Sequence, residues 1–284
     1  MKKYLSLVLF AHTIFAMPFA FIGFFLALTT TDYAFSWMKL VFMILCMVFA
    51  RNSAMAFNRY LDRNFDARNP RTIVRDIPAG RIPAKNALIF TLVNCTLFVF
   101  TTYFINPLCF YLSPVALAVV LGYSFTKRFT PLCHLILGVG LGLAPIGAYL
   151  VVTGQFALLP IFFSLAVVCW VSGFDIIYAL QDDEFDKSSN LYSIPAALGR
   201  KKALMVSSIL HVFSVIFVTI PLFYTELGGF YIAGILFFIG LLIYQHRLVK
   251  PDDLSKVNLA FGTTNGIASV IFAVFFLLDI YFRQ

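Results

Sequence analysis

The chain of 284 residues is 61% hydrophobic and only 12% charged, and its mean hydropathy is +0.91. Because soluble domains are about half apolar, this composition excludes an ordinary soluble domain and indicates an integral membrane protein. The formal net charge of +8 has no soluble basic segment to carry it, so we expect a lipid bilayer as partner and no nucleic acid.

Apolar stretches long enough to cross a bilayer, about 17–25 residues, recur along the chain. We predict nine transmembrane helices, at residues 4–28, 35–57, 87–105, 108–122, 132–152, 158–180, 204–223, 229–244 and 259–281. The fourth stretch is short and could be tilted or partly broken. The first stretch is too long for the apolar part of a cleavable signal peptide. The predicted fold is all-α, a polytopic membrane protein with one domain over residues 1–284.

Basic residues predict the orientation of these spans. Of the 21 Lys and Arg, 18 lie before the first span or in the connections after the second, fourth, sixth and eighth spans. Positively charged loops stay on the cytoplasmic side of a membrane. We therefore expect a protein of the inner (plasma) membrane with its N-terminus and these connections in the cytoplasm, and its C-terminus outside.

Polar residues are concentrated at the end of the second predicted span. Asn58, Asp62 and Asp66 are spaced four residues apart, so on a helix they lie along one face. Asp182 and Asp186 repeat this spacing at the end of the sixth span. Acidic residues at a membrane surface are often simply solvated, but carboxylates four residues apart on a helix repel each other and need a counter-charge. The helical spacing in both places favours a binding site.

Mg²⁺ suits these side chains because it prefers hard oxygen ligands and is typically held by a few carboxylates together with substrate phosphates. Four aspartates from two helix ends therefore predict a magnesium site. Nearby arginines favour a diphosphate as the group that is bound. Each aspartate pair is followed by a basic loop and an IPA sequence, which suggests an internal repeat, although so short a match could be a coincidence.

Together these motifs resemble those of the UbiA superfamily of intramembrane prenyltransferases. The motif N-x-x-x-D-x-x-x-D is present as Asn58-Asp62-Asp66, D-x-x-x-D as Asp182-Asp186, and Y-x-x-x-K as Tyr123 to Lys127. The resemblance covers nearly the whole chain and implies nine helices, with two cytoplasmic loops that cap the active site. The runs around the aspartate motifs are most similar to the 4-hydroxybenzoate polyprenyltransferase branch.

The resemblance implies a Mg²⁺-dependent transfer of a polyprenyl group from a polyprenyl diphosphate to an aromatic acid, such as 4-hydroxybenzoate, in quinone biosynthesis. The four motif aspartates would hold the metal, with Asn58 as an added oxygen ligand. Lys127 would contact the diphosphate, and Tyr123 would orient this lysine or face the allylic cation. Arg59 and Arg128 are further diphosphate candidates, although Arg128 could be an ordinary charge of the cytoplasmic side.

Two charged residues lie deeper in the predicted spans. Arg51 is seven residues before Asn58, and Asp175 is seven before Asp182, so each lies on the face of its motif, two turns further into the membrane. Ionisable groups inside a membrane are costly and indicate function. Arg51 could bind the carboxylate of the acceptor and Asp175 its phenol, or the two could pair with each other. His12 is either a packed core residue or a neighbour of the acceptor.

Other functions are less well supported by the sequence. A dihydroxynaphthoate of menaquinone biosynthesis is the second candidate acceptor, because the run FAHTIFAMPFA lacks the basic-Pro pattern expected of 4-hydroxybenzoate enzymes. A multi-span transporter is a more distant alternative, but a transporter would place its polar residues near the middle of the bilayer. The D-G-x-x-A-R pattern of CDP-alcohol transferases is absent from the chain.

Overall fold

The computed structural model describes residue 7 and residues 15–283. Within them the chain forms helices joined by turns, without a β-strand. The helices are α2 (Met17–Thr30), α3 (Trp37–Asp66), α4 (Ala84–Tyr103), α5 (Pro107–Thr126), α6 (Cys133–Thr153), α7 (Leu158–Ala179), α8 (Asp183–Ser188), α9 (Ile194–Leu198), α10 (Arg200–Thr219), α11 (Gly229–Leu248) and α12 (Asn265–Tyr281). Short 3-10 turns follow α7 (Leu180–Asp182) and α10 (Ile220–Phe223), and a π-helical turn (Leu259–Thr264) precedes α12.

The predicted all-α membrane fold is confirmed. In the described part of the chain, eight helices are long and apolar enough to cross a membrane, and α2 is a shorter apolar helix. Each predicted span coincides with one of these nine helices. The fourth is a continuous helix of 20 residues in spite of Pro114 inside it. Helix α2 lies in the first predicted span, whose earlier residues, with His12, fall outside the described residues.

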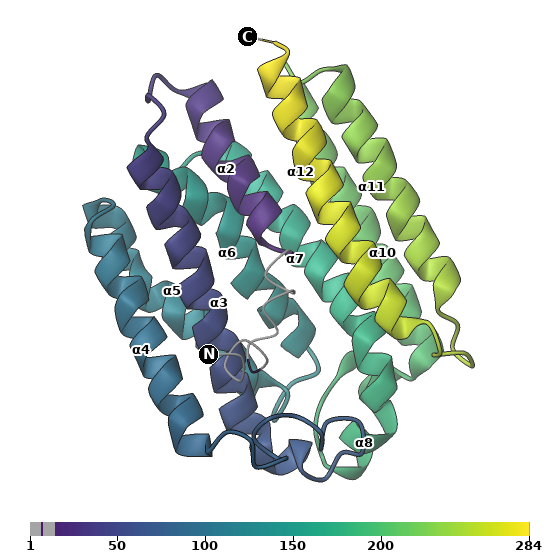
Figure 1. Ribbon diagram of the computed structural model, residues 1–284. Helices are drawn as coiled ribbons and strands as arrows, with labels where there is room; N and C mark the ends of the chain where they lie inside the picture. Colours follow the sequence, from purple (N-terminus) through teal and green to yellow (C-terminus); the bar gives the residue numbers. More distant parts are fainter. Residues whose placement is uncertain (1–6, 8–14, 284) are drawn as a thin grey trace.

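The spans are packed side by side, as Figure 1 shows, with α3, α4 and α5 on one side and α10, α11 and α12 on the other. Helices α2, α6 and α7 lie between these two groups and pack against each other. The crossing of α2 and α6 depends on Gly23, because a Cβ atom there would meet the carbonyl oxygen of Pro145. Small residues at such crossings let helix backbones approach closely in a membrane protein.

Local sequence signals fix several helix ends. The side chain of Ser36 accepts a hydrogen bond from the backbone of Lys39 at the start of α3. Asn106 caps α5 in the same way through the backbone of Cys109, at 2.8 Å. Gly154 caps the end of α6, and its φ of 64° is left-handed, a conformation that glycine adopts without a steric penalty.

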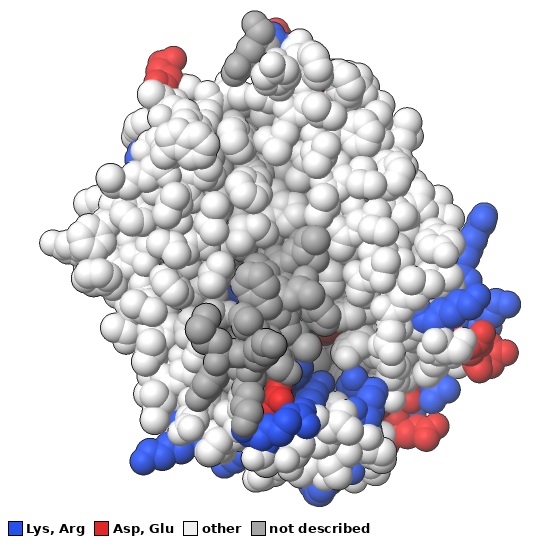
Figure 2. Space-filling view, in the orientation of Figure 1, with Lys and Arg blue, Asp and Glu red and all other residues white. Residues whose placement is uncertain are grey.

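The protein core is aromatic and lies among α2, α6, α7, α11 and α12. Its largest fully buried side chains include Trp170, Phe19, Phe163, Phe272 and Phe276. The outer faces of the spans are also apolar, as expected of a surface that contacts lipid. Figure 2 shows this surface as mainly uncharged, while Lys, Arg, Asp and Glu gather mostly at one end of the molecule. That end holds α8 and the loop between α3 and α4 (Figure 1).

Candidate active site

A cavity of about 260 Å³ lies at the charged end of the molecule, lined by α3, α5, α6 and α7 and by the loops that follow α3 and α7. Ten of the twelve residues predicted for the site line it: Arg51, Asn58, Arg59, Asp62, Asp66, Tyr123, Lys127, Asp175, Asp182 and Asp186. Arg128 is not part of this lining, and His12 lies outside the described residues. The fold thus brings together motifs that are more than a hundred residues apart in the sequence.

Asp62 is buried on α3 and holds two cations from the turn after α5. Its carboxylate lies 2.9 Å from Lys127 Nζ and 2.9 Å from Arg128 Nη2. The amide of Asn58 also donates to Asp62 Oδ2, at 3.2 Å. Lys127 therefore reaches the cavity as predicted, but it forms an ion pair with Asp62 there. Arg128 forms a second ion pair with Asp62 and donates to the carbonyl of Ser124.

Asp66 lies one turn further along α3 and is held from the following loop. Arg75 Nη1 donates to its Oδ1 at 2.6 Å, and Thr72 Oγ1 donates to its backbone carbonyl at 3.2 Å. The second carboxylate oxygen of Asp66 is buried and has no hydrogen-bond partner among the described residues. A buried charged oxygen without a donor is costly, so this oxygen would be stabilised by a further donor or a cation.

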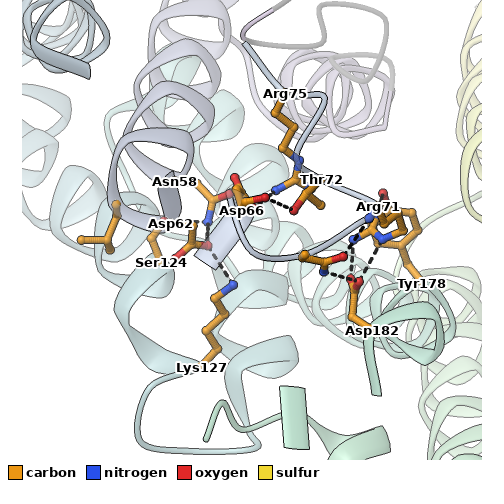
Figure 3. A network of polar contacts seen from close by, with 12 residues as sticks. Asn58, Asp62, Asp66, Arg71, Thr72, Arg75, Ser124, Lys127, Tyr178 and Asp182 are labelled. Carbon is orange, nitrogen blue, oxygen red and sulfur yellow. Dashed lines mark hydrogen bonds and ion pairs between the residues drawn. The ribbon is translucent and has the colours of Figure 1, made fainter. Parts of the chain in front are cut away.

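Asp182 is fixed by the same loop, as Figure 3 shows. Asn69 Nδ2 and Arg71 Nε each donate to Asp182 Oδ1 at 2.9 Å, and Arg71 Nη2 reaches Oδ2. Arg71 Nη1 also donates to the hydroxyl of Tyr178 at 2.7 Å. Burial alone would lower the pKa of Arg71, but its hydrogen bonds to Asp182 and its contacts with Tyr178 outweigh this effect and raise it. Arg71 is therefore a permanent cation at this edge of the cavity.

The run DDEFD divides between two environments. Asp182 and Asp186 line the cavity, whereas Asp183 is buried outside it and forms a bidentate ion pair with Arg200, at 2.9 Å for each bond. The spacing of Asp182 and Asp186 is that of a regular helix. The structure has a 3-10 turn between α7 and α8 at this point, but both predicted side chains still reach the cavity.

Arg51 and Asp175 do not pair with each other, so this alternative from the sequence is wrong. Asp175 Oδ2 lies 2.7 Å from His134 Nδ1, and His134 Nε2 accepts a hydrogen bond from the backbone of Ile194 at 3.3 Å. Since Nε2 accepts, the proton of a neutral His134 ring is on Nδ1 and points at Asp175. Arg51 Nε is buried and has no partner among the described residues.

Several residues of the cavity were not predicted. The loop residues Asn69, Arg71 and Arg75 hold the motif aspartates, and the only signal for them was a basic loop with two arginines four residues apart. Tyr178 lies four residues before Asp182, and its place on the same helix face could have been found from this spacing. His134 gave no signal, because a single histidine in an apolar span is most often a packed core residue.

A second cavity, of about 350 Å³, continues from the first into the apolar part of the molecule. It is lined almost entirely by apolar side chains of α3, α4, α5 and α6. On α6 its lining runs from Leu137 to Val151, a rise of about 21 Å along a helix. The two cavities share the residues Arg51, Met55, Tyr123, Leu137 and Leu141. A charged chamber and an apolar channel thus meet at Arg51 and Tyr123.

The charged cavity fits a divalent cation only together with a ligand. Among the described residues, no three carboxylate, imidazole or thiol side chains come close enough to hold a metal ion unaided. Mg²⁺, however, is usually held by one or two carboxylates plus water and substrate phosphates. The hard oxygens of two aspartate pairs on one cavity, with the unpaired Oδ2 of Asp66, match that requirement.

Two curated proteins with similar sequences share one name. The chain is 30% identical over 223 residues to a 4-hydroxybenzoate octaprenyltransferase of Tolumonas auensis. The aligned region covers 78% of each chain. It is 29% identical over 234 residues to a protein of the same name from Photobacterium profundum, covering 82% of this chain and 81% of the other.

Two solved structures with the same fold are described as UbiA homologues. The apo structure of the homologue from Aeropyrum pernix K1 has a TM-score of 0.81 and 28% identity and covers 96% of this chain and 98% of that one. A homologue from Archaeoglobus fulgidus bound to DMAPP and Mg²⁺ has a TM-score of 0.75 and 20% identity, with coverage of 98% and 99%. The family profile described as the UbiA prenyltransferase family matches residues 16–277. With motifs, fold and profile in agreement, the chain belongs to the UbiA prenyltransferase family.

Proposed function

We propose that this protein transfers a polyprenyl group from a polyprenyl diphosphate to 4-hydroxybenzoate or a similar aromatic acid, a step of quinone biosynthesis. One observation carries the proposal: a cavity rich in carboxylates and cations opens into an apolar channel at Arg51 and Tyr123. This arrangement suits a substrate with a diphosphate head and an isoprenoid tail. The shared name of the curated relatives supports 4-hydroxybenzoate as the acceptor.

The charged cavity would bind the diphosphate together with Mg²⁺. Asp62, Asp66, Asp182 and Asp186 would hold the metal, with Asn58 as an added ligand. When bound, the metal neutralises charge on the diphosphate and stabilises it as a leaving group. The Archaeoglobus homologue bound to DMAPP and Mg²⁺ supports this assignment.

Basic side chains of the cavity would hold the phosphate oxygens. Arg59 lines the cavity without an ion pair to any described residue, so it can contact the diphosphate directly. Arg71, Arg75 and Lys127 would turn from the aspartates to the phosphates once the carboxylates bind the cation. Fixed cations around a leaving group stabilise the negative charge that develops on it in the transition state.

The acceptor would lie where the two cavities meet. Arg51 would hold its carboxylate, which accounts for a buried guanidinium nitrogen without a partner. The C1–O bond of the prenyl diphosphate breaks, and the leaving diphosphate keeps the electron pair. The ring carbon beside the phenol hydroxyl then bonds to the allylic cation. The proton of that carbon passes to the carboxylate of Asp175, and its C–H electrons restore the aromatic ring.

His134 would be a positioning residue for this proton transfer. Its Nδ1–H fixes Asp175 Oδ2 at 2.7 Å, which leaves Asp175 Oδ1 to face the ring. General bases of this kind contribute about 10²–10⁴-fold to a rate. Because the backbone of Ile194 holds the other ring nitrogen, the imidazole cannot turn away from the carboxylate without losing a hydrogen bond.

The protein would act as one domain in the inner membrane, with the charged cavity on the cytoplasmic side. The gathering of 18 basic residues before the first span and in alternate connections and the charged end of the molecule in Figure 2 support this orientation.

A membrane assay tests the function directly. One labelled polyprenyl diphosphate is offered 4-hydroxybenzoate and a dihydroxynaphthoate separately, with Mg²⁺ or with EDTA, and the products are identified by mass. We expect prenylated 4-hydroxybenzoate with Mg²⁺ and no product with EDTA. Exclusive prenylation of the naphthoate would move the enzyme to menaquinone biosynthesis. Prenylation of neither acid, with turnover of a non-acidic acceptor such as a glycerol phosphate lipid, would contradict the proposal.

A further inference from the structure

The turn that precedes α12 is π-helical over Leu259–Thr264. A π-helical turn contains one residue more than an α-helical turn, so it rotates the residues before it by about 100° relative to the helix that follows. Such turns are rare and are found frequently at functional sites. This turn contains Phe261, whose side chain lines the charged cavity.

Side chains from three helices support this turn. Asn265 Nδ2 donates to the carbonyls of Ala260 and Phe261, at 3.1 and 2.9 Å. Gln245 Nε2, from α11, donates to the same carbonyl of Ala260 at 3.1 Å. The indole of Trp170, on α7, in turn donates to Asn265 Oδ1 at 3.1 Å. Carbonyls that a regular helix would satisfy by itself are thus satisfied by fully buried amides.

The result is an aromatic wall of the cavity, made of Phe174, Tyr178 and Phe261. The ring of Phe261 stacks on Tyr178, with centroids 4.2 Å apart and planes 29° apart. It meets Phe174 edge-on, at 5.4 Å and 75°. Phe174 and Tyr178 flank Asp175 on either side in the sequence, so the wall lies next to the carboxylate to which we assign the ring proton.

We propose that the π-helical turn places Phe261 as the surface against which the acceptor ring packs, and that this residue sets which aromatic ring the enzyme accepts. The proposal rests on the proposed function. An acceptor ring beside Asp175 needs an apolar face to pack on, and aromatic rings pair favourably in offset-stacked and edge-on arrangements. Asn265 is then a positioning residue, because it holds the turn and not the acceptor.

The first test replaces Phe261 by leucine, which removes the ring and keeps an apolar side chain. In Phe261→Leu we expect the KM for 4-hydroxybenzoate to rise about tenfold, as expected for the loss of an aromatic pair. The KM for the polyprenyl diphosphate should stay within twofold of wild type, which also shows that the variant is folded. The wider pocket should raise kcat/KM for a dihydroxynaphthoate relative to that for 4-hydroxybenzoate.

The second test separates positioning from general stability. Asn265→Ala should raise the acceptor KM in the same direction, and the double variant with Phe261→Leu should be no worse than the more severe single variant. The effects of two substitutions do not add when one residue acts through the other. If Asn265→Ala only lowered stability, its effect would add to that of Phe261→Leu. Phe230→Leu is the matched control. It removes a ring that stacks on Phe282 at 5.4 Å and does not line the cavity, so the acceptor KM should not change.

Two results would overturn the inference in distinguishable ways. An acceptor KM and an acceptor preference that stay within twofold of wild type in Phe261→Leu would show that the acceptor does not pack on this wall. If the wild-type enzyme prenylates no aromatic acid at all, the proposed function is wrong, and so is the role of the aromatic wall in binding the acceptor.

Discussion

Asp66→Asn tests whether a motif carboxylate serves a ligand or only the fold. The substitution keeps the size of the side chain and removes its charge. Asp66 presents one oxygen to Arg75 at 2.6 Å and one buried oxygen that has no partner among the described residues. In the proposed function this second oxygen binds the cation that accompanies the diphosphate, and an amide is a poor substitute for it.

The structure sets the size of both effects. An amide oxygen can still accept from Arg75, so only the charged part of that hydrogen bond is lost. We expect the free energy of unfolding to fall by about 1 kcal/mol, which is the difference between a charged and a neutral hydrogen bond. The loss of an electrostatic stabiliser of the leaving group should lower kcat by about 10²–10³. The variant should still be folded, so its lower stability alone would reduce activity only slightly. The observed fall in kcat should therefore be far larger than lower stability explains.

Asp76→Asn is the matched control for this prediction. Asp76 is also a buried carboxylate. It lies in the loop that follows α3 and pairs with Arg81 at 2.7 Å, but it does not line the cavity. Thermal unfolding and a Mg²⁺ titration of prenyl transfer are measured for both variants. The reasoning is refuted if Asp66→Asn keeps a wild-type kcat and Mg²⁺ dependence. It is also refuted if both variants lose activity equally and in proportion to their stability.

Two further predictions concern the acceptor and the orientation. Arg51→Gln should raise the acceptor KM at least tenfold, and Asp175→Asn should lower kcat about 10²–10⁴-fold. The KM for the diphosphate should stay unchanged in both variants. An unchanged acceptor KM in Arg51→Gln would show that Arg51 is a structural residue. Single cysteines at Ser189 and Ser36, in a chain without its native cysteines, should react with a membrane-impermeant reagent from opposite sides, and reaction from one side would contradict the nine-span topology.

The sequence was sufficient for the fold and for the helices of the site. Apolar length alone located the spans, because a bilayer demands a fixed number of apolar residues per helix. The four-residue spacing of Asn58, Asp62 and Asp66 placed them correctly on one face of α3, since nothing in that helix interrupts its period.

The partners of these side chains could not be predicted. Arg71 contacts Asp182, which is 111 residues away, and the loop that carries the arginine has no periodicity from which its direction could be inferred. The alternative in which Asp175 pairs with Arg51 was wrong for a similar reason. Helix faces predict which residues point into a space, but not that His134 of α6 reaches Asp175 before Arg51 of α3 does. The π-helical turn depends on amides of Gln245 and Asn265, which have no local sequence signature.

The charges of the cavity explain why the site needs both loops and helices. Its lining carries five acidic residues and five basic residues, which are Asp62, Asp66, Asp175, Asp182 and Asp186, and Arg51, Arg59, Arg71, Arg75 and Lys127. The formal charges cancel, which matters because an unbalanced charge at the edge of a membrane is costly.

A diphosphate with Mg²⁺ brings charges of both signs into this neutral cavity. In the proposed function, carboxylates that now hold Arg71, Arg75 and Lys127 would exchange these partners for the metal. The released cations would meet the phosphates, so the cations that leave the aspartates are not left without a partner. Such an exchange requires that the carboxylates stay fixed while the cations move. The sequence meets this requirement by placing Asp62 and Asp66 on a long helix, and Arg71 and Arg75 on the loop that follows it.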